Sequence, residues 1–216
     1  MDFLLKFANG FAPDSDGMIY MWALLIALVF MLAIAIDRYI YIYVRSNVNA
    51  ERFMAEVMKL VKSGDIQKAI NLCKSAGEKA LPIVVLAALE RAKEDKNFRS
   101  IQNAVDEGTL AILPKLNRRT NLLQMVGNVS TLIGLMGTIY GLIKSFEAVA
   151  NPLVEQSQKT QLLAQGIAIA MNTTLFGLAV AIPAIIIHQI IINKTGQIIE
   201  DIDENILKLV NLLTGE

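Results

Sequence analysis

The stretch from Leu162 to Asn193 constrains the fold of this chain more than any other feature. It contains 32 consecutive residues without Asp, Glu, Lys or Arg. As a helix it would be about 48 Å long at ~1.5 Å per residue, whereas the hydrocarbon core of a bilayer is ~30 Å thick. The segment therefore predicts a helix that crosses a membrane and continues beyond it.

Two other runs also lack these four charged residues, namely Gly17–Ile36 with 20 residues and Thr120–Ile143 with 24. A spanning helix needs about 20 apolar residues, and 54% of this chain is hydrophobic. No alternation typical of strands is present. We therefore predict an all-α integral membrane protein. Its three spanning helices are expected over residues 18–43, 120–144 and 161–193.

The basic residues predict the orientation of the spans. Of the 20 Lys and Arg, 15 lie between Arg38 and Arg119, where nine acids leave a net charge of +6. Loops that flank spanning helices and are rich in Lys and Arg lie in the cytoplasm. We therefore expect a helical cytoplasmic domain over residues 44–119 and a loop on the opposite side over residues 145–160. The N-terminus is then outside and the C-terminus inside.

The two ends of the chain are predicted to be amphipathic. Residues 1–17 contain five Phe and Leu side chains before a turn, which indicates a short segment on the outer membrane interface. Residues 194–216 carry isoleucines and leucines on one face and acids on the other, which is typical of an amphipathic helix. This helix is expected to extend the third span into the cytoplasm.

Capping residues divide the cytoplasmic insert into four helices. Asn49 is expected to cap a helix that ends at Gly64, and Asp65 is expected to cap the next one. Pro82 suits the first turn of a third helix, which ends near Asp95. Ser100 is expected to cap the fourth helix, which continues toward the second span.

Small residues on the second and third spans predict close contacts between helices. Glycines spaced three and four residues apart share one face of a helix and allow another helix to approach closely. Proline inside a helix bends it. The residues expected to shape this packing are Gly134, Gly137, Gly141, Gly166, Gly177 and Pro183.

Four polar residues of the same spans, Thr138, Asn172, Thr173 and Thr174, are the candidates for an ion path through the membrane. Thr138 can line a path through the membrane or bond a carbonyl of its own helix, and both interpretations stay open. Asn172, Thr173 and Thr174 are consecutive and cover about 200° of a helix surface, so they cannot all face one partner. We expect Thr174 to meet Thr138 across a helix pair and Thr173 to face elsewhere.

The three predicted spans contain neither the residues of a catalytic site nor those of a complete proton path. A proton path needs a titratable group near the centre of the membrane, and the only candidate, His188, lies near the inner boundary. The chain therefore conducts nothing, or a partner supplies the carboxylate. We expect no enzymatic activity, resident cofactor, metal site or nucleic-acid partner. The single Cys73 is expected to be a buried packing residue.

Two long motifs resemble those of a known family. Residues 132–141 read LIGLMGTIYG and resemble the LLGLLGTVxG motif of the MotA/TolQ/ExbB family. Residues 166–184 read GIAIAMNTTLFGLAVAIPA and resemble its GIxxALxxTxxGLxxAIPA motif. The basic LNRR stretch at 116–119 also matches. The three spans and the large insert are similar to those of the ExbB/TolQ branch.

This resemblance implies a function. Members of the family form a pentameric ring in the bacterial inner membrane, with a periplasmic N-terminus and a cytoplasmic C-terminus. The ring surrounds a dimer of a single-span ExbD/TolR-like partner that carries a membrane Asp. Flow of H⁺ or Na⁺ drives rotation and thereby work in the cell envelope. The pore hydroxyls of the family correspond to Thr138 and Thr174. The alternative is a non-conducting membrane scaffold in which the polar cluster serves packing alone.

The chain departs from the family pattern at several positions. Ile169 occupies a position where ExbB and TolQ usually carry Glu, so the partner's Asp would be the only carboxylate. Ser130 and Thr131 replace an Ala-Pro pair. Thr173 before Thr174 is similar to sodium-driven flagellar stators, and hydroxyl oxygens are ligands that a hard cation prefers. Transient binding of Na⁺ near Thr173 and Thr174 is therefore one hypothesis, and H⁺ is the other.

Overall fold

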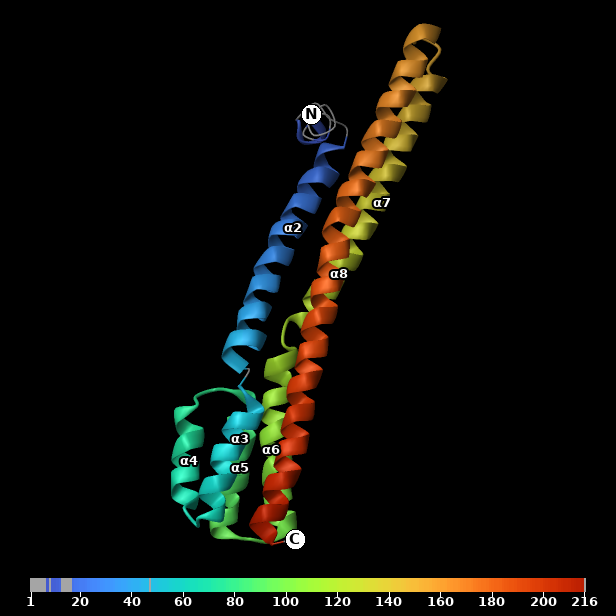
Figure 1. Ribbon diagram of the computed structural model, residues 1–216. Helices are drawn as coiled ribbons and strands as arrows, with labels where there is room; N and C mark the ends of the chain where they lie inside the picture. The colour runs from blue at the N-terminus through green and yellow to red at the C-terminus, as the bar shows by residue number, and fades with distance from the viewer. Residues whose placement is uncertain (1–6, 8, 13–16, 47, 216) are drawn as a thin grey trace. The chain divides into compact units, whose positions relative to one another are not determined.

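The computed structural model describes residues 7, 9–12, 17–46 and 48–215 (Figure 1). Every regular element within these ranges is helical, as predicted. The elements are the 3₁₀-helix η1 (Asn9–Phe11), α2 (Met18–Tyr39), the π-helix η2 (Ile40–Ser46), α3 (Ala50–Lys62), α4 (Ile66–Ser75), α5 (Ala80–Glu94), α6 (Phe98–Asn117), α7 (Thr120–Ala150) and α8 (Gln156–Thr214).

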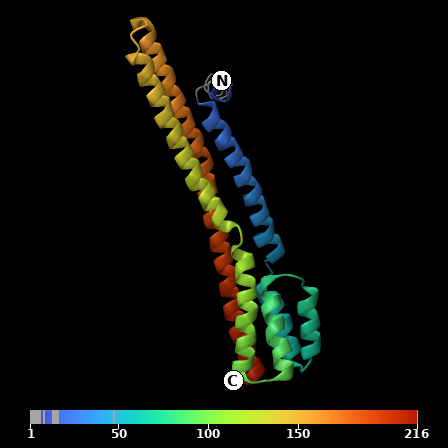
Figure 2. The same ribbon diagram turned by 180° about the vertical axis from the view of Figure 1, so that it is seen from behind.

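Contacts within the chain divide it into two compact units. The first comprises Met1–Ile36 with Asn121–Gln189, and the second comprises Asp37–Thr120 with Ile190–Glu216. In the first unit α7 and α8 run side by side as a hairpin (Figures 1 and 2). In the second unit the short helices α3, α4 and α5 pack together, and α6 lies beside the last part of α8 (Figures 1 and 2).

Three helical stretches are long and apolar enough to cross a membrane, and they lie within Met18–Lys62, Phe98–Ala150 and Gln156–Thr214. Each overlaps one of the three charge-free runs over its whole length apart from Gly17, so the number and order of candidate spans are confirmed. Many large apolar side chains on α2, including Ile26, Val29 and Ile36, are exposed. Such exposure is expected of a helix in contact with lipid, which is as apolar as these side chains.

The predicted loop over residues 145–160 is wrong at both ends. Helix α7 continues to Ala150 and α8 already begins at Gln156, so residues 151–155 alone connect them. Pro152 cannot continue the ladder of helical hydrogen bonds, and the Asn151 side chain accepts a hydrogen bond from the backbone N–H of Leu153 at 2.9 Å. The helices therefore continue beyond the charge-free runs into residues that include charged side chains.

Two other predicted helix boundaries differ from those in the structure. Helix α2 ends at Tyr39 rather than at residue 43, and the chain continues as the π-helix η2. The predicted helix over 194–216 is not a separate element, because α8 runs without interruption to Thr214. Its expected continuity with the third span is thus confirmed, and Pro183 lies inside it. Most of the predicted segment 1–17 is outside the described residues, and its described part contains only η1.

The four predicted helices of the insert are present, but only one predicted cap forms. The Asn49 side chain accepts a hydrogen bond from the backbone of α3 at 3.0 Å. Asp65 makes no such bond to α4 and pairs with the Lys68 ammonium at 2.7 Å instead. The prediction that Ser100 caps the fourth helix is wrong, because α6 begins earlier and is capped by the side chain of Asn97.

A buried arginine joins the start of the second unit to the connection between α6 and α7. Arg38 is 4% exposed, and its guanidinium donates to the carbonyl oxygen of Arg118 at 2.7 Å. Asp37 pairs with Arg38 at 3.0 Å and with Arg119 at 3.6 Å. Arg119 has a φ of 61°, which non-glycine residues seldom adopt. These bonds therefore stabilise a sharp turn between α6 and α7.

The core of the second unit is centred on α5, whose Val84, Val85, Ala88 and Leu89 are all 0% exposed. Cys73 of α4 is 2% exposed, as expected for a packing residue. Burial raises the pKa of its thiol from 9.0 to about 12.

This raised pKa leads to a prediction for thiol labelling. Because the thiolate is the reactive form, we expect iodoacetamide to label Cys73 at least about 100-fold more slowly in the native protein than in denaturant near neutral pH. Labelling of the folded protein should continue to accelerate with pH above 9, where the unfolded thiol is already ionised. Mass spectrometry of the labelled chain measures both rates, and equal rates would contradict burial of Cys73.

Candidate functional site

The contact between α7 and α8 is built from small residues that leave no room for side chains. A Cβ atom at Gly177 would lie 2.8 Å from the carbonyl oxygen of Ser130 and 3.0 Å from Cα of Gly134. A Cβ atom at Gly141 would lie 3.0 Å from the carbonyl oxygen of Gly166. Only glycine lets two helix backbones approach this closely. The five predicted glycines thus all lie at this one contact.

Thr173 faces the interior of the same contact. Its side chain is 1% exposed, and a Cβ atom at Gly137 would lie only 2.6 Å from its hydroxyl oxygen. The hydroxyl donates to the carbonyl oxygen of Ala170, one turn earlier on α8, at 2.9 Å. Thr173 is therefore enclosed between the helices and bonded to its own backbone.

Thr174 and Thr138 meet across the helix pair, as expected from their positions in the sequence. Their hydroxyl oxygens are in hydrogen-bonding contact. Thr138 Oγ1 also lies 3.1 Å from the carbonyl oxygen of Gly134 and 3.3 Å from that of Ala170. Thr174 Oγ1 lies 3.3 Å from the same Gly134 oxygen.

These contacts form a cluster of four oxygens, namely the hydroxyls of Thr138 and Thr174 and the carbonyls of Gly134 and Ala170. A hydroxyl has one proton to donate and two lone pairs to accept with. The contact between Thr138 and Thr174 uses one lone pair of one of the two hydroxyl oxygens, so lone pairs on both oxygens remain available to another donor or to a cation. The oxygens of the cluster can therefore accept a hydrogen bond from another group or act as ligands of a hard cation.

The cluster opens onto a groove on the surface of the hairpin. The groove has a volume of about 570 Å³, and Thr138, Asn172 and Thr174 supply its polar groups. Its other lining residues are apolar or small: Ala168, Met171, Leu175 and Leu178. Three of the four predicted ion-path residues thus lie together, whereas Thr173 is not part of the groove.

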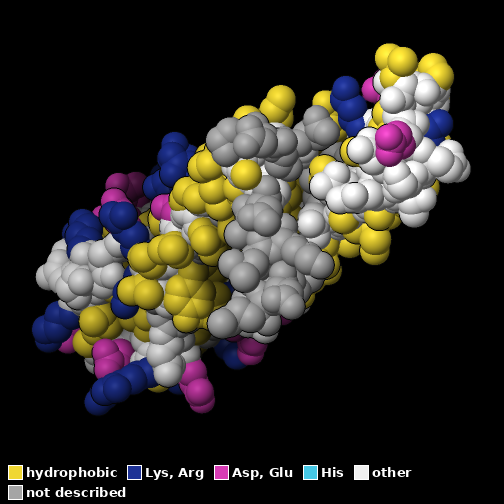
Figure 3. Space-filling view, turned by 90° about the horizontal axis from the view of Figure 1, so that it is seen from above, with side chains coloured by type: hydrophobic (Ala, Val, Ile, Leu, Met, Phe, Trp, Pro, Cys, Tyr) yellow, Lys and Arg dark blue, Asp and Glu magenta, His cyan; other side chains and the backbone are white. Residues whose placement is uncertain are grey.

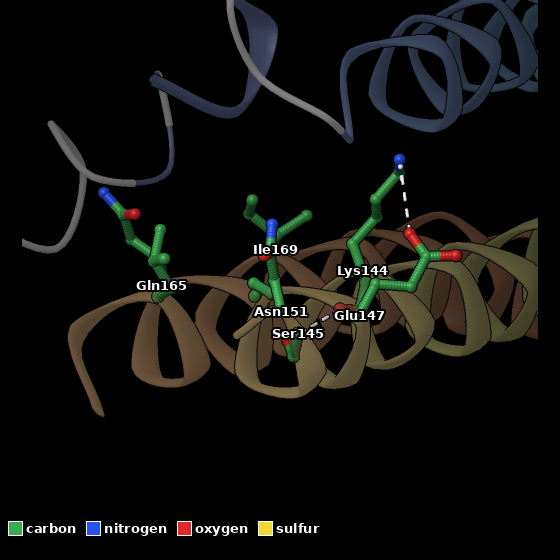
Figure 4. Close-up of a pocket in the computed structure, with 10 residues that line it drawn as sticks. Lys144, Ser145, Glu147, Asn151, Gln165 and Ile169 are labelled. Carbon is green, nitrogen blue, oxygen red and sulfur yellow. Dashed lines mark hydrogen bonds and ion pairs between the residues drawn. The ribbon is translucent and has the colours of Figure 1, made fainter. Parts of the chain in front are cut away.

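A second, more polar cavity lies near the end of the hairpin where α7 and α8 are joined (Figure 4). It has a volume of about 340 Å³. Figure 4 shows Lys144, which pairs with Glu147 at 3.5 Å, at one end of the lining and Gln165 at the other end. Seen from above, lysine and acidic side chains lie on this part of the surface (Figure 3). Ile169 lines this cavity and not the groove.

Sequence reasoning missed two buried serines that extend the row of small residues on α7. Ser130 is 0% exposed and Ser145 is 1% exposed. A Cβ atom at Gly166 would overlap the Ser145 hydroxyl, which donates to the carbonyl oxygen of Gly141 at 2.8 Å. Each serine lies four residues from the nearest glycine of the row, Gly134 or Gly141, and this spacing was the signal that would have found them.

His188 is buried in α8, at 7% exposure. Its Nε2 atom makes no hydrogen bond among the described residues. The imidazole lies outside the set of residues that line the groove, and no titratable side chain of the described residues is in that set.

Comparison with known proteins identifies a matching family and several relatives that are named ExbB. The family described as the MotA/TolQ/ExbB proton channel family matches residues 76–204. The chain is 29% identical to the biopolymer transport protein ExbB of Pseudomonas putida over 147 residues, which are 64% of this chain and 43% of that protein. It is 34% identical to the ExbB of Salmonella typhimurium over 109 residues, which are 50% of this chain and 41% of that protein.

A relative of similar extent is the putative biopolymer transport protein ExbB-like 3 of Synechocystis sp., which is 29% identical over 158 residues, 73% of each chain. The match to the Pseudomonas and Salmonella proteins covers less than half of their length. The family match extends over more than half of this chain and includes both threonines and all five packing glycines. This chain is therefore an all-α membrane protein that belongs to the MotA/TolQ/ExbB proton channel family, in its ExbB-like branch.

Proposed function

We propose that this chain is the ring subunit of an ion-driven motor in the bacterial inner membrane. Flow of H⁺ or Na⁺ through the ring is coupled to transport or other work in the cell envelope. The observation that carries the proposal is the oxygen cluster of Thr138 and Thr174, which opens onto a groove with apolar walls. The N-terminus is proposed to be periplasmic and the C-terminus cytoplasmic, from the distribution of basic residues.

The groove supplies half of an ion path. Its oxygens can bind a passing ion weakly, but its lining residues include no carboxylate. A partner with one spanning helix and a membrane Asp, of the ExbD/TolR kind, provides the missing titratable group. In a pentameric ring around a dimer of that partner, each subunit presents one groove to the centre. The relatives are named biopolymer transport proteins, which supports a role in transport across the envelope.

A structure of the purified complex tests this arrangement. We expect coexpression with a single-span ExbD-like protein to yield a five-fold ring. Thr138 and Thr174 should face a central pair of helices that carries the Asp. A ring with lipid at its centre and no stable partner would contradict the proposal and favour the scaffold.

The nature of the ion is tested by flux into proteoliposomes that contain the complex. The Thr173 hydroxyl is buried and donates to its own helix, so the extra oxygen expected for Na⁺ is not directed into the groove. We therefore expect flux at fixed pH to be the same with Na⁺ and with K⁺ in the buffer, as for a proton path. Flux that requires Na⁺ would instead show that Thr173 reorients to bind it.

A further inference from the structure

Nothing in the proposed motor uses an open crevice in the second unit. It has a volume of about 580 Å³ and is lined by residues of η2 and of the α4–α5 connection: Ile40, Val44, Arg45, Ala76, Glu78 and Lys79. Apolar and charged side chains both line it, and we call Ile40 and Val44 its apolar wall and Arg45, Glu78 and Lys79 its charged wall. Such a division is typical of a site that binds an amphipathic molecule.

The position of η2 along the chain sets the depth of the crevice. The first charge-free run has 20 residues and ends at Ile36, so a helix over it is about as long as the ~30 Å hydrocarbon core. Residues 40–45 follow at ~1.5 Å per residue and therefore lie about 6–14 Å beyond that core. Tyr39 and Tyr43, whose rings stack at 4.8 Å, lie in the same segment, and tyrosines are enriched at membrane interfaces.

The apolar wall faces outward instead of being buried by the protein. Ile40 is 51% exposed and Val44 is 65% exposed. An acyl chain or a glycerol backbone can cover them at this depth, whereas a small soluble anion cannot.

The charged wall carries an excess of one positive charge. Arg45 pairs with Glu78 at 3.1 Å, and the five N–H donors of a guanidinium leave others for a second acceptor. Lys79 is half-buried as a residue, and its ammonium makes no hydrogen bond or ion pair with any described residue. It is thus an unpaired cation that lines the same crevice as Ile40 and Val44, which is suited to a phosphate that is attached to a hydrophobic group.

We propose that this crevice binds one anionic phospholipid. The phosphate lies against Lys79 and Arg45, and the first carbons of the lipid lie against Val44 and Ile40. The site is independent of ion conduction, because it lies in the second unit and shares no residue with the groove of Thr138 and Thr174.

Native mass spectrometry of the full-length purified chain tests the site. The protein is incubated with equal amounts of phosphatidylglycerol and phosphatidylcholine that carry identical acyl chains. We expect the wild-type chain to retain phosphatidylglycerol preferentially. Lys79→Ala should lower that preference about five-fold, since one basic residue near an anionic surface contributes about 1 kcal/mol. Lys79→Arg should retain it, and Lys68→Ala, at an exposed lysine paired with Asp65, is the matched control.

Two further measurements distinguish binding of a lipid from binding of a free anion. Val44→Gln should weaken retention of phosphatidylglycerol, because the apolar wall is then polar. A large excess of inorganic phosphate should not displace the lipid from the wild-type chain. The proposal is overturned if Lys79→Ala retains phosphatidylglycerol as the wild type does, or if inorganic phosphate displaces it. Loss of ion flux would not bear on this result, since the assay measures lipid retention alone.

Discussion

Replacing Thr174 by Val is expected to lower ion flux through the reconstituted complex about ten- to hundred-fold while the ring stays assembled. Valine has nearly the shape of threonine but no hydroxyl, so the α7–α8 contact keeps its packing. The oxygen cluster loses one of its two hydroxyls. A hydrogen bond to a charged group contributes about 1.5–3 kcal/mol, and every 1.4 kcal/mol is about a factor of ten. Proton flux into proteoliposomes measures the effect.

Thr131→Val is the matched control for this experiment. The Thr131 hydroxyl also lies near a carbonyl of its own helix, that of Gly127, at 3.1 Å, but the residue does not line the groove. We expect its flux to equal that of the wild type. If Thr174→Val breaks up the ring, the hydroxyl serves packing and the scaffold interpretation gains support. Unchanged flux in an intact ring would exclude Thr174 from the ion path.

Replacing Gly177 by Leu is expected to cause the largest loss of stability of any single change in the hairpin. The nearest atoms to a new Cβ are the carbonyl oxygen of Ser130 at 2.8 Å and Cα of Gly134 at 3.0 Å. Both are backbone atoms of a helix, so they cannot rotate away as a side chain does. Overpacking typically costs about 1–3 kcal/mol and occasionally more, and we expect a loss of about 3 kcal/mol or more here.

Gly196→Leu is the matched control, because no atom lies within 4 Å of a Cβ built at Gly196. Leucine is also a better helix former than glycine, so α8 should be unchanged or slightly more stable. Thermal unfolding of the detergent-solubilised variants, followed by helical circular dichroism, compares the two. A Gly177→Leu protein that melts at the wild-type temperature would show that α7 and α8 do not pack as closely as described.

Some features of the site could be derived from the sequence because they depend on spacing along one helix. Gly134, Gly137 and Gly141 share a face by periodicity alone, and a face of glycines has few uses other than close packing. The meeting of Thr138 and Thr174 followed from that face together with the consecutive positions of Asn172, Thr173 and Thr174. In contrast, which of these three side chains would be enclosed could not be derived, since it depends on the rotation of α8 against α7.

The errors at helix ends have a common physical origin. Residues 145–150 contain one Glu and were assigned to a loop, although a helix tolerates charge wherever it leaves the hydrocarbon core. Likewise Ser100 is a good capping residue, but Asn97 precedes it and accepts a hydrogen bond from the backbone N–H of Arg99 in the first turn of α6. Local propensity identifies several residues able to end a helix, and hydrogen bonding in the folded chain selects among them.

The sequence by itself determined the number of candidate spans, their order, the helical insert and the family, because hydrophobicity, charge and motif spacing are properties of contiguous residues. Only the tertiary structure decided that Thr173 is enclosed against Gly137 while Thr174 faces a groove, and that Lys79 lies beside Val44 although 34 positions separate them in the chain. These arrangements depend on how helices distant in sequence pack against one another. That packing is decided by steric fit between their surfaces, which no local pattern records.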